Sequence, residues 1–96
     1  MTERTRDPKV EAFLAVSAAR LAPRTVDAYR RDLTAFAGWL GRAPSRATSE
    51  ELERYVSVLR AEGLAATTIA RRIAAIRSFF RHQVLIGARE DRKSVV

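Results

Sequence analysis

The chain of 96 residues is long enough for one small domain and too short for two. It has no cysteine and a single histidine, His82, which excludes a disulfide framework, a cysteine-based zinc site and a histidine-rich metal site. Eighteen lysines and arginines against eleven acidic residues give a net charge of +7. Such an excess favours a nucleic acid or another anionic surface as the partner over a small-molecule substrate.

Targeting and cofactor signals are absent from the sequence. No apolar run approaches the roughly 18 residues that span a bilayer, and the polar start of the chain is unlike a signal peptide. We therefore expect a cytoplasmic protein with no membrane partner. Because there is neither a glycine-rich phosphate loop nor a metal-ligand spacing, we expect no cofactor and no bound metal.

Two helices are predicted in the first half of the chain. Asp7 is a good cap residue and is followed by Pro8 at the first helical position, so a helix should begin there and run to about Ala19. Residues 21–23, Leu-Ala-Pro, open a second helix in the same way, and Gly41 closes it.

Two more helices are predicted in the second half. The sequence Thr-Ser-Glu-Glu at residues 48–51 is typical of a capping box, and the helix that it starts should end at Gly63. A fourth helix should run from about residue 66 to residue 85 and stop at Gly87. No stretch alternates polar and apolar residues over five positions, so the domain is predicted to be all-α.

The positive charge is concentrated on the second and fourth predicted helices. Residues 20–46 carry a net charge of +4, and residues 64–88 carry +4 with no acidic residue, whereas residues 47–63 carry −2. Sixteen of the 18 cations are arginines, so GC-rich coding is an alternative explanation for their number. That bias would spread arginine evenly, and we therefore interpret the segregation as functional.

The fourth predicted helix has two contrasting faces at 100° per residue. The predicted core stripe consists of Ile69, Ile73, Ile76, Phe80 and Val84, and the opposite face of Thr67, Arg71, Ala75, Ser78 and His82. The opposite face is small, polar and cationic, so it is suited to enter a DNA groove. Arg72, Arg77 and Arg81 flank it, within reach of phosphates.

The second predicted helix resembles the fourth. Its buried stripe should consist of Val26, Tyr29, Leu33, Phe36, Ala37 and Leu40. Arg24 and Arg31 lie opposite that stripe, and Arg30 lies at its edge. The third predicted helix presents an acidic face, which phosphate would repel, so we expect it to point away from any duplex.

A short internal repeat links the two basic helices. Residues 21–26, Leu-Ala-Pro-Arg-Thr-Val, recur 43 positions later as Leu-Ala-Ala-Thr-Thr-Ile. Thr25 and Thr68 then fall in the first turn of each helix, where free backbone N–H groups suit phosphate contacts. A chance likeness between two short amphipathic helices is the alternative.

The sequence resembles a known family in two places. Residues 21–33 read LAPRTVDAYRRDL and lead on to Trp39. This stretch resembles the second helix of Xer-type tyrosine recombinases, which reads L-[SA]-x-x-T-x-x-x-Y-x-R-D-L followed by an aromatic residue. Residues 63–73 and 75–80 resemble the fourth helix of the same family. The resemblance covers nearly the whole chain. It implies the N-terminal core-binding domain, a SAM-like orthogonal bundle of four helices that forms half of a C-shaped clamp around DNA.

The resemblance also implies a division of the chain and a set of partners. Residues 1–88 should form the DNA-binding core-binding domain, and residues 89–96 should begin a linker to a catalytic domain that the chain does not contain. The implied partners are the double-stranded DNA of a recombination site, the protein's own catalytic domain and other recombinase protomers in a tetramer. The sequence departs from the family at Ala22 and Ala65, where a serine cap is common, and in residues 89–96, which lack the usual Asn-Pro.

Together, the charge pattern and the resemblance give twelve candidate DNA-binding residues. These are Arg24, Thr25, Arg30, Arg31, Thr67, Thr68, Arg71, Arg72, Arg77, Ser78, Arg81 and His82. The implied role is to position a site-specific recombinase on its site for cleavage and rejoining of DNA.

Catalytic residues are not expected in this chain. Enzymes of this family use a tyrosine nucleophile with an Arg…His-x-x-Arg…Tyr arrangement, and nothing in the sequence matches that pattern. Tyr29 and Tyr55 fall on apolar stripes, which indicates core positions. We expect the chain to be the N-terminal part of a longer recombinase. The main alternative is a helical protein-interaction module with an acidic partner, and an autonomous helix-turn-helix regulator fits the long connection at residues 41–47 poorly.

Overall fold

The computed structural model describes residues 7–87. Within them lie four α-helices and one short 3-10 turn, in the order α1 (Pro8–Ala18), α2 (Pro23–Leu40), η2 (Pro44–Arg46), α3 (Ser49–Ala61) and α4 (Ala66–Leu85). The described residues contain no strand, so the all-α prediction is confirmed, and each helix lies close to its predicted bounds. The predicted linker at residues 89–96 lies outside the described part.

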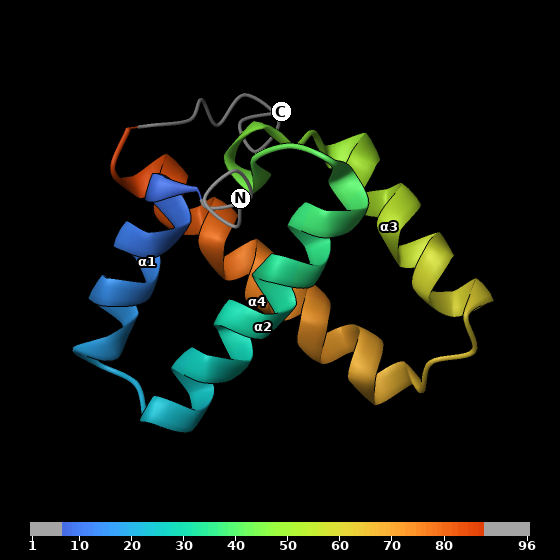
Figure 1. The fold of residues 1–96 in the computed structure, drawn as a ribbon, viewed down its shortest axis with the longest axis horizontal. Coiled ribbons are helices and arrows are strands. Elements are labelled where there is room, and N and C mark those ends of the chain that lie inside the picture. The colour runs from blue at the N-terminus through green and yellow to red at the C-terminus, as the bar shows by residue number, and fades with distance from the viewer. Residues whose placement is uncertain (1–6, 88–96) are drawn as a thin grey trace.

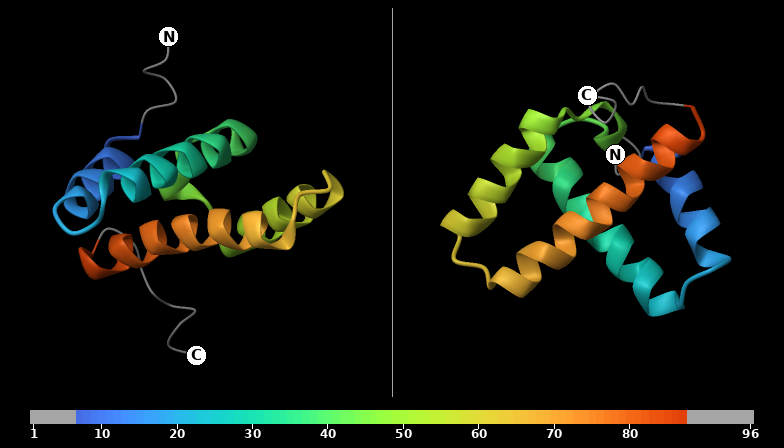
Figure 2. Two further views of the ribbon diagram at one scale, coloured as in Figure 1. Left: turned by 90° about the horizontal axis from the view of Figure 1, so that it is seen from below. Right: turned by 180° about the vertical axis from the view of Figure 1, so that it is seen from behind.

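The helices form two layers that cross (Figure 1). Seen from below, α1 and α2 make one layer and α4 and α3 make the other (Figure 2, left). The long helices α2 and α4 cross at the centre, with α1 on one side of the crossing and α3 on the other. Both central helices contact each other, α1 and α3. This crossed arrangement is the orthogonal bundle that the sequence analysis predicted.

The core is built around the two central helices. Leu33 and Phe36 of α2, and Ile76 and Phe79 of α4, are each at most 1% exposed. Leu33 and Ile76 are separated by 43 residues, and so are Phe36 and Phe79. This is the offset of the internal repeat. Burying a side chain of this size stabilises the fold by about 1.5–3 kcal/mol, so each of these four contributes to the stability of the domain.

Side-chain caps define the starts of α1 and α3. One carboxylate oxygen of Asp7 accepts a hydrogen bond from the backbone N–H of Lys9 at 3.0 Å, and the other accepts from the N–H of Ser45 at 3.1 Å. This second bond ties the start of α1 to η2. At α3, Thr48 and Glu51 form the predicted capping box, with bonds of 3.1 and 2.9 Å.

The starts of α2 and α4 are different. Ala22 and Ala65 occupy the cap positions with nearly identical backbone angles, φ −63° with ψ 149° and 148°, and neither offers a side-chain bond. The free N–H groups of both first turns therefore have no side-chain acceptor at the cap. Gly41 closes α2 in the left-handed conformation, with φ 78°, as expected for a glycine after a helix.

One prediction about α4 is wrong. Ala75 was placed on a free polar face, but it is 1% exposed. It lies one turn after Arg71, which pairs with Asp32 of α2, so α4 faces α2 rather than solvent at Ala75. The reason is that α4 is covered on two sides, and a small residue allows close approach where the helices cross. Phe80, which the sequence places in the core, is only half-buried. Its neighbour Phe79 is fully buried instead.

Candidate nucleic-acid interface

The first turns of α2 and α4 lie at the same edge of the molecule, the lower edge in Figure 1. The two helices diverge from their crossing toward this edge, so their N-terminal halves form its two sides. Eight of the predicted residues lie in the first three turns of these helices. Two of them, Arg30 and Arg72, are engaged mainly within the domain, and we call the other six the N-terminal edge. They are Arg24, Thr25, Arg31, Thr67, Thr68 and Arg71.

The N-terminal edge has the electrostatics that suit an anion. Arg24, Arg31 and Thr67 are exposed, while Thr25 and Thr68 are half-buried in the first turns. The positive ends of two helix dipoles add to the arginine charges there, and neither end is neutralised by an acidic residue in its first turn. Backbone N–H groups, hydroxyls and guanidinium groups are the donors that proteins use for phosphate oxygens.

Arg71 is held at the crossing by a buried acid. Its Nη1 donates to Oδ2 of Asp32 at 2.8 Å, and the Asp32 side chain is only 3% exposed. The Arg71 side chain is 48% exposed, so part of its guanidinium still faces solvent. The pair therefore fixes the orientation of Arg71 without consuming all of its donors.

Arg72 is partly buried between the helices. Its Nε is buried without a hydrogen bond and lies 4.0 Å from Oδ1 of Asp32. Arg72 also lies near Tyr55: burial raises the pKa of the Tyr55 phenol, and the nearby Arg72 charge opposes that rise. These surroundings indicate that Arg72 helps to hold α2, α3 and α4 together.

Arg30 is also engaged within the domain. Its Nη1 donates to the Glu11 carboxylate of α1 at 2.9 Å, and the two side chains are 50% and 36% exposed. An ion pair with this exposure is worth at most about 1 kcal/mol. A phosphate could therefore replace Glu11 at little cost.

The remaining predicted residues lie along the second half of α4. The His82 ring packs against Phe13 of α1, with centroids 5.4 Å apart. Ser78, Arg81 and His82 line a small cavity of about 190 Å³ between α4 and α1. Arg77 lies elsewhere, beside a groove that faces α3. Six of the twelve predicted residues thus lie along the N-terminal edge, and the other six pack within the domain or lie on other surfaces.

Asp32 is the residue that sequence reasoning missed. It is one of two acids on the basic helix α2, and it is the buried partner of Arg71 and lies near Arg72. A signal was present, because residue 32 falls beside the apolar stripe at helical spacing, four positions before Phe36. An acid at such a position indicates a buried charge that must be paired.

Comparison with known protein families identifies the family of the chain. The family model described as "Phage integrase, N-terminal SAM-like domain" matches residues 10–85. The chain belongs to this family. The predicted resemblance to Xer-type recombinases is thereby confirmed, and the bundle described above is the SAM-like domain of the phage integrase family.

Curated relatives agree with this assignment. The chain is 38% identical over 82 residues to the tyrosine recombinase XerC of Chromohalobacter salexigens, which covers 81% of the chain and 28% of that relative. It is 34% identical over 88 residues to the tyrosine recombinase XerD of Agrobacterium fabrum, which covers 86% of the chain and 27% of that relative. The chain therefore spans less than a third of the length of these relatives. No solved structure matches.

Two further findings concern the described residues. Between residues 7 and 87, no helix is both long enough and apolar enough to cross a bilayer. In the same range, no three histidine, aspartate or glutamate side chains gather in a way that could hold a metal ion.

Proposed function

We propose that this SAM-like domain binds duplex DNA as one half of a clamp, and that it positions a site-specific tyrosine recombinase on its recombination site. The observation that carries the proposal is that two uncapped helix starts and three arginines lie along one edge of the domain, the N-terminal edge. The acidic residues of α3 lie on a different helix, which fits a duplex approaching along α2 and α4.

The expected contacts are mostly to the phosphate backbone. Arg24 and Arg31 are exposed and take part in none of the ion pairs among residues 7–87, so they are free to neutralise phosphates. Arg71, oriented by Asp32, is the best placed of the six for a directed contact, because its geometry is fixed before DNA arrives. Thr67 and Thr68 add hydroxyl donors at the start of α4.

The wider role follows from the family and belongs to the same proposal. A catalytic domain joined after α4 would form the other half of the clamp. It would cleave and rejoin DNA through its own tyrosine. Other protomers would complete a tetramer on the recombination site, in the cytoplasm. The present chain would contribute binding and positioning.

A salt titration tests the proposal. The 96-residue chain is titrated with a short mixed-sequence duplex at several salt concentrations. If about five phosphates are engaged, log K should fall against log salt with a slope near −4.5. The variant with Arg24→Glu and Arg31→Glu should bind more weakly and lower the slope by about 2, since each neutralised phosphate contributes about 0.9.

A matched control uses an exposed arginine of α3. Arg54→Glu makes half of that change of charge, the change of one substitution, on a helix that we expect to point away from DNA, so it should leave the slope nearly unchanged. Arg71→Glu is not a clean test, because it would place a second carboxylate against the buried Asp32. No salt-dependent binding of the unaltered chain at about 20 mM salt, where screening is weak, would contradict the proposal.

A further inference from the structure

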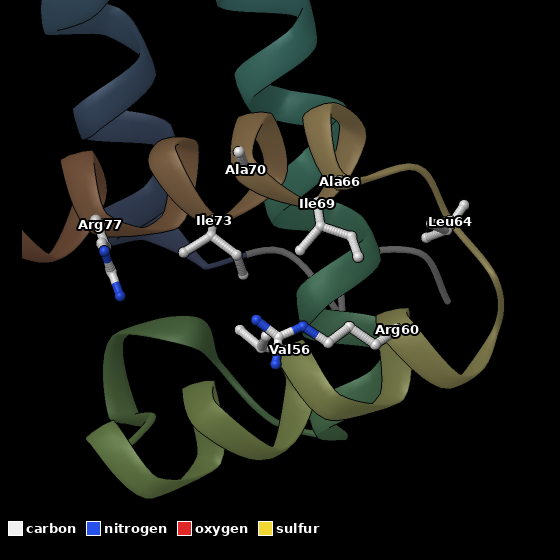
Figure 3. A pocket seen from close by; sticks show the side chains of 8 residues that line it. All are labelled: Val56, Arg60, Leu64, Ala66, Ile69, Ala70, Ile73 and Arg77. Atoms are coloured by element: carbon white, nitrogen blue, oxygen red, sulfur yellow. The ribbon is translucent and has the colours of Figure 1, made fainter.

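A second surface lies between α3 and α4, separate from the N-terminal edge. It is a groove of about 390 Å³, open to solvent and lined by both helices and by the loop that joins them (Figure 3). Arg77 lies at this groove, although the sequence analysis had grouped it with the DNA-facing residues.

The floor of the groove is apolar. Ile69 and Ile73, whose exposed fractions are 8% and 7%, point from α4 toward α3, and the half-buried Val56 of α3 lies across from them (Figure 3). Ile69 and Ile73 are one helical turn apart, which matches the spacing of anchor residues on a bound helix. Ala66 and Ala70 are small and exposed, so they leave the floor open from the side.

The rim of the groove is cationic. The Arg60 side chain extends from α3 along the groove toward Val56, and Arg77 reaches from α4 toward α3 (Figure 3). Both arginines are exposed, and neither takes part in any ion pair among residues 7–87. No acidic residue lines the groove. Two guanidinium groups thus lie beside an apolar floor with no anion of the described chain to bind them.

We infer that this groove docks a short acidic amphipathic helix of a partner protein. The apolar face of that helix would fill the space over Ile69, Ile73 and Val56, and its carboxylates would pair with Arg60 and Arg77. Guanidinium groups bind carboxylates through two parallel hydrogen bonds, which would fix the register of the bound helix.

Charge and chemistry argue against two other occupants. A phosphate backbone would satisfy the arginines and leave the apolar floor without a partner. A second copy of the chain could offer its exposed Leu85 and Ile86, which are 79% and 57% exposed, but Arg81 lies one turn before Leu85. That copy would bring more positive charge to a rim that is already positive.

The inference does not depend on DNA binding, because it uses none of the six residues of the N-terminal edge. The variant with Arg24→Glu and Arg31→Glu therefore separates the two proposals: it should lose DNA affinity and keep peptide affinity. The reverse result is expected when the groove arginines are changed.

The probe is a synthetic helical peptide of about four turns, with leucines along one face and glutamates on the others. Its affinity for the 96-residue chain is measured by anisotropy of a dye on the peptide, and its site by shifts of the Ile69, Ile73 and Val56 methyl signals in NMR spectra. A second peptide carries glutamine in place of every glutamate.

Three variants define the expected result. Arg60→Glu combined with Arg77→Glu should weaken binding of the glutamate peptide about tenfold or more, because attraction becomes repulsion at two points. Ala70→Phe should also weaken it by filling the open side of the groove, with no change of charge. Arg54→Glu, which makes half of that charge change on α3 away from the lining residues, should have little effect. Circular dichroism confirms that each variant keeps its helices.

Several outcomes would overturn the inference. If the glutamine peptide bound as tightly as the glutamate peptide, the two arginines would not be pairing with carboxylates of the bound helix. Methyl shifts on another face, or no binding at millimolar peptide, would show that the groove is not a docking site for such a helix. A duplex that displaces the peptide and shifts the same methyl signals would assign the groove to nucleic acid.

Discussion

Arg71 of α4 donates a 2.8 Å hydrogen bond to Asp32 of α2, across the point where the two central helices meet. The carboxylate is 3% exposed, and Arg72 lies 4.0 Å from its second oxygen. A buried acid between two arginines fixes the register of the crossing, because sliding either helix by one residue would leave a buried charge unpaired. It also holds Arg71 in place at the N-terminal edge.

Asp32→Ala should destabilise the domain. Removing the carboxylate leaves the buried Arg72 Nε and part of Arg71 without their counter-charge, and the expected loss is about 1–3 kcal/mol in the free energy of unfolding. Urea denaturation followed by circular dichroism measures it. Asp27→Ala, which removes an exposed acid from the same helix, should change stability by less than about 0.5 kcal/mol. Similar losses in both variants would contradict the structural role of Asp32.

Ala65→Ser should stabilise the domain. Ala65 already has the extended backbone of a cap residue, so a serine hydroxyl could accept a hydrogen bond from the first turn of α4. The expected gain is about 0.5–1 kcal/mol, read as a higher midpoint of unfolding in urea. Ala66→Ser, one residue later and inside the helix, is the control and should give no gain.

Replacing Glu51 should change the acid sensitivity of the domain. The pKa of Glu51 is lowered chiefly by the hydrogen bond from the Thr48 backbone N–H, with further help from Arg42. The folded state therefore favours the ionised form. The resulting stability is present at neutral pH and is lost as the pH falls below the ordinary range of glutamate, about 4.3.

The measurement is the difference in melting temperature between pH 7 and pH 3. Glu51→Gln cannot ionise, so this variant should melt lower at pH 7 and lose less on acidification than the unaltered chain. Glu53→Gln, on the exposed side of the same helix, should behave like the unaltered chain. The prediction fails if Glu51→Gln keeps the full pH dependence.

Two neighbouring phenylalanines test the packing of α4. Phe79 is fully buried and contacts Phe13 edge to face at a centroid distance of 5.6 Å, whereas Phe80 is half-buried. Phe79→Ala should cost about 3–5 kcal/mol, which is enough to unfold many domains of this size. Phe80→Ala should cost clearly less. Loss of helical circular dichroism at 25 °C in the first variant alone would agree with this packing.

The helices and most of the core could be predicted because their signals are local. Pro8, the capping box at Thr48 and Gly41 lie within a few residues of the helix ends that they define, and the caps have the predicted geometry. Phe36 and Phe79 are separated by 43 residues, the offset of the internal repeat. Both side chains are fully buried.

The free surface of α4 could not be predicted in the same way. Helical periodicity separates an apolar stripe from a polar one, but it does not reveal that α2 and α1 cover part of the polar stripe. Ala75 and His82 therefore looked exposed in sequence, although the first is buried and the second packs against Phe13. The pairing of Asp32 with Arg71 spans 39 residues, and no local pattern specifies it.

The cations of α2 and α4 are all arginines, and this has a consequence for regulation. The two lysines of the chain, Lys9 and Lys93, lie outside both helices. Acetyltransferases neutralise charge at the primary amine of lysine, and a guanidinium group offers them no substrate. The positive charge of the N-terminal edge is therefore beyond the reach of lysine acetylation.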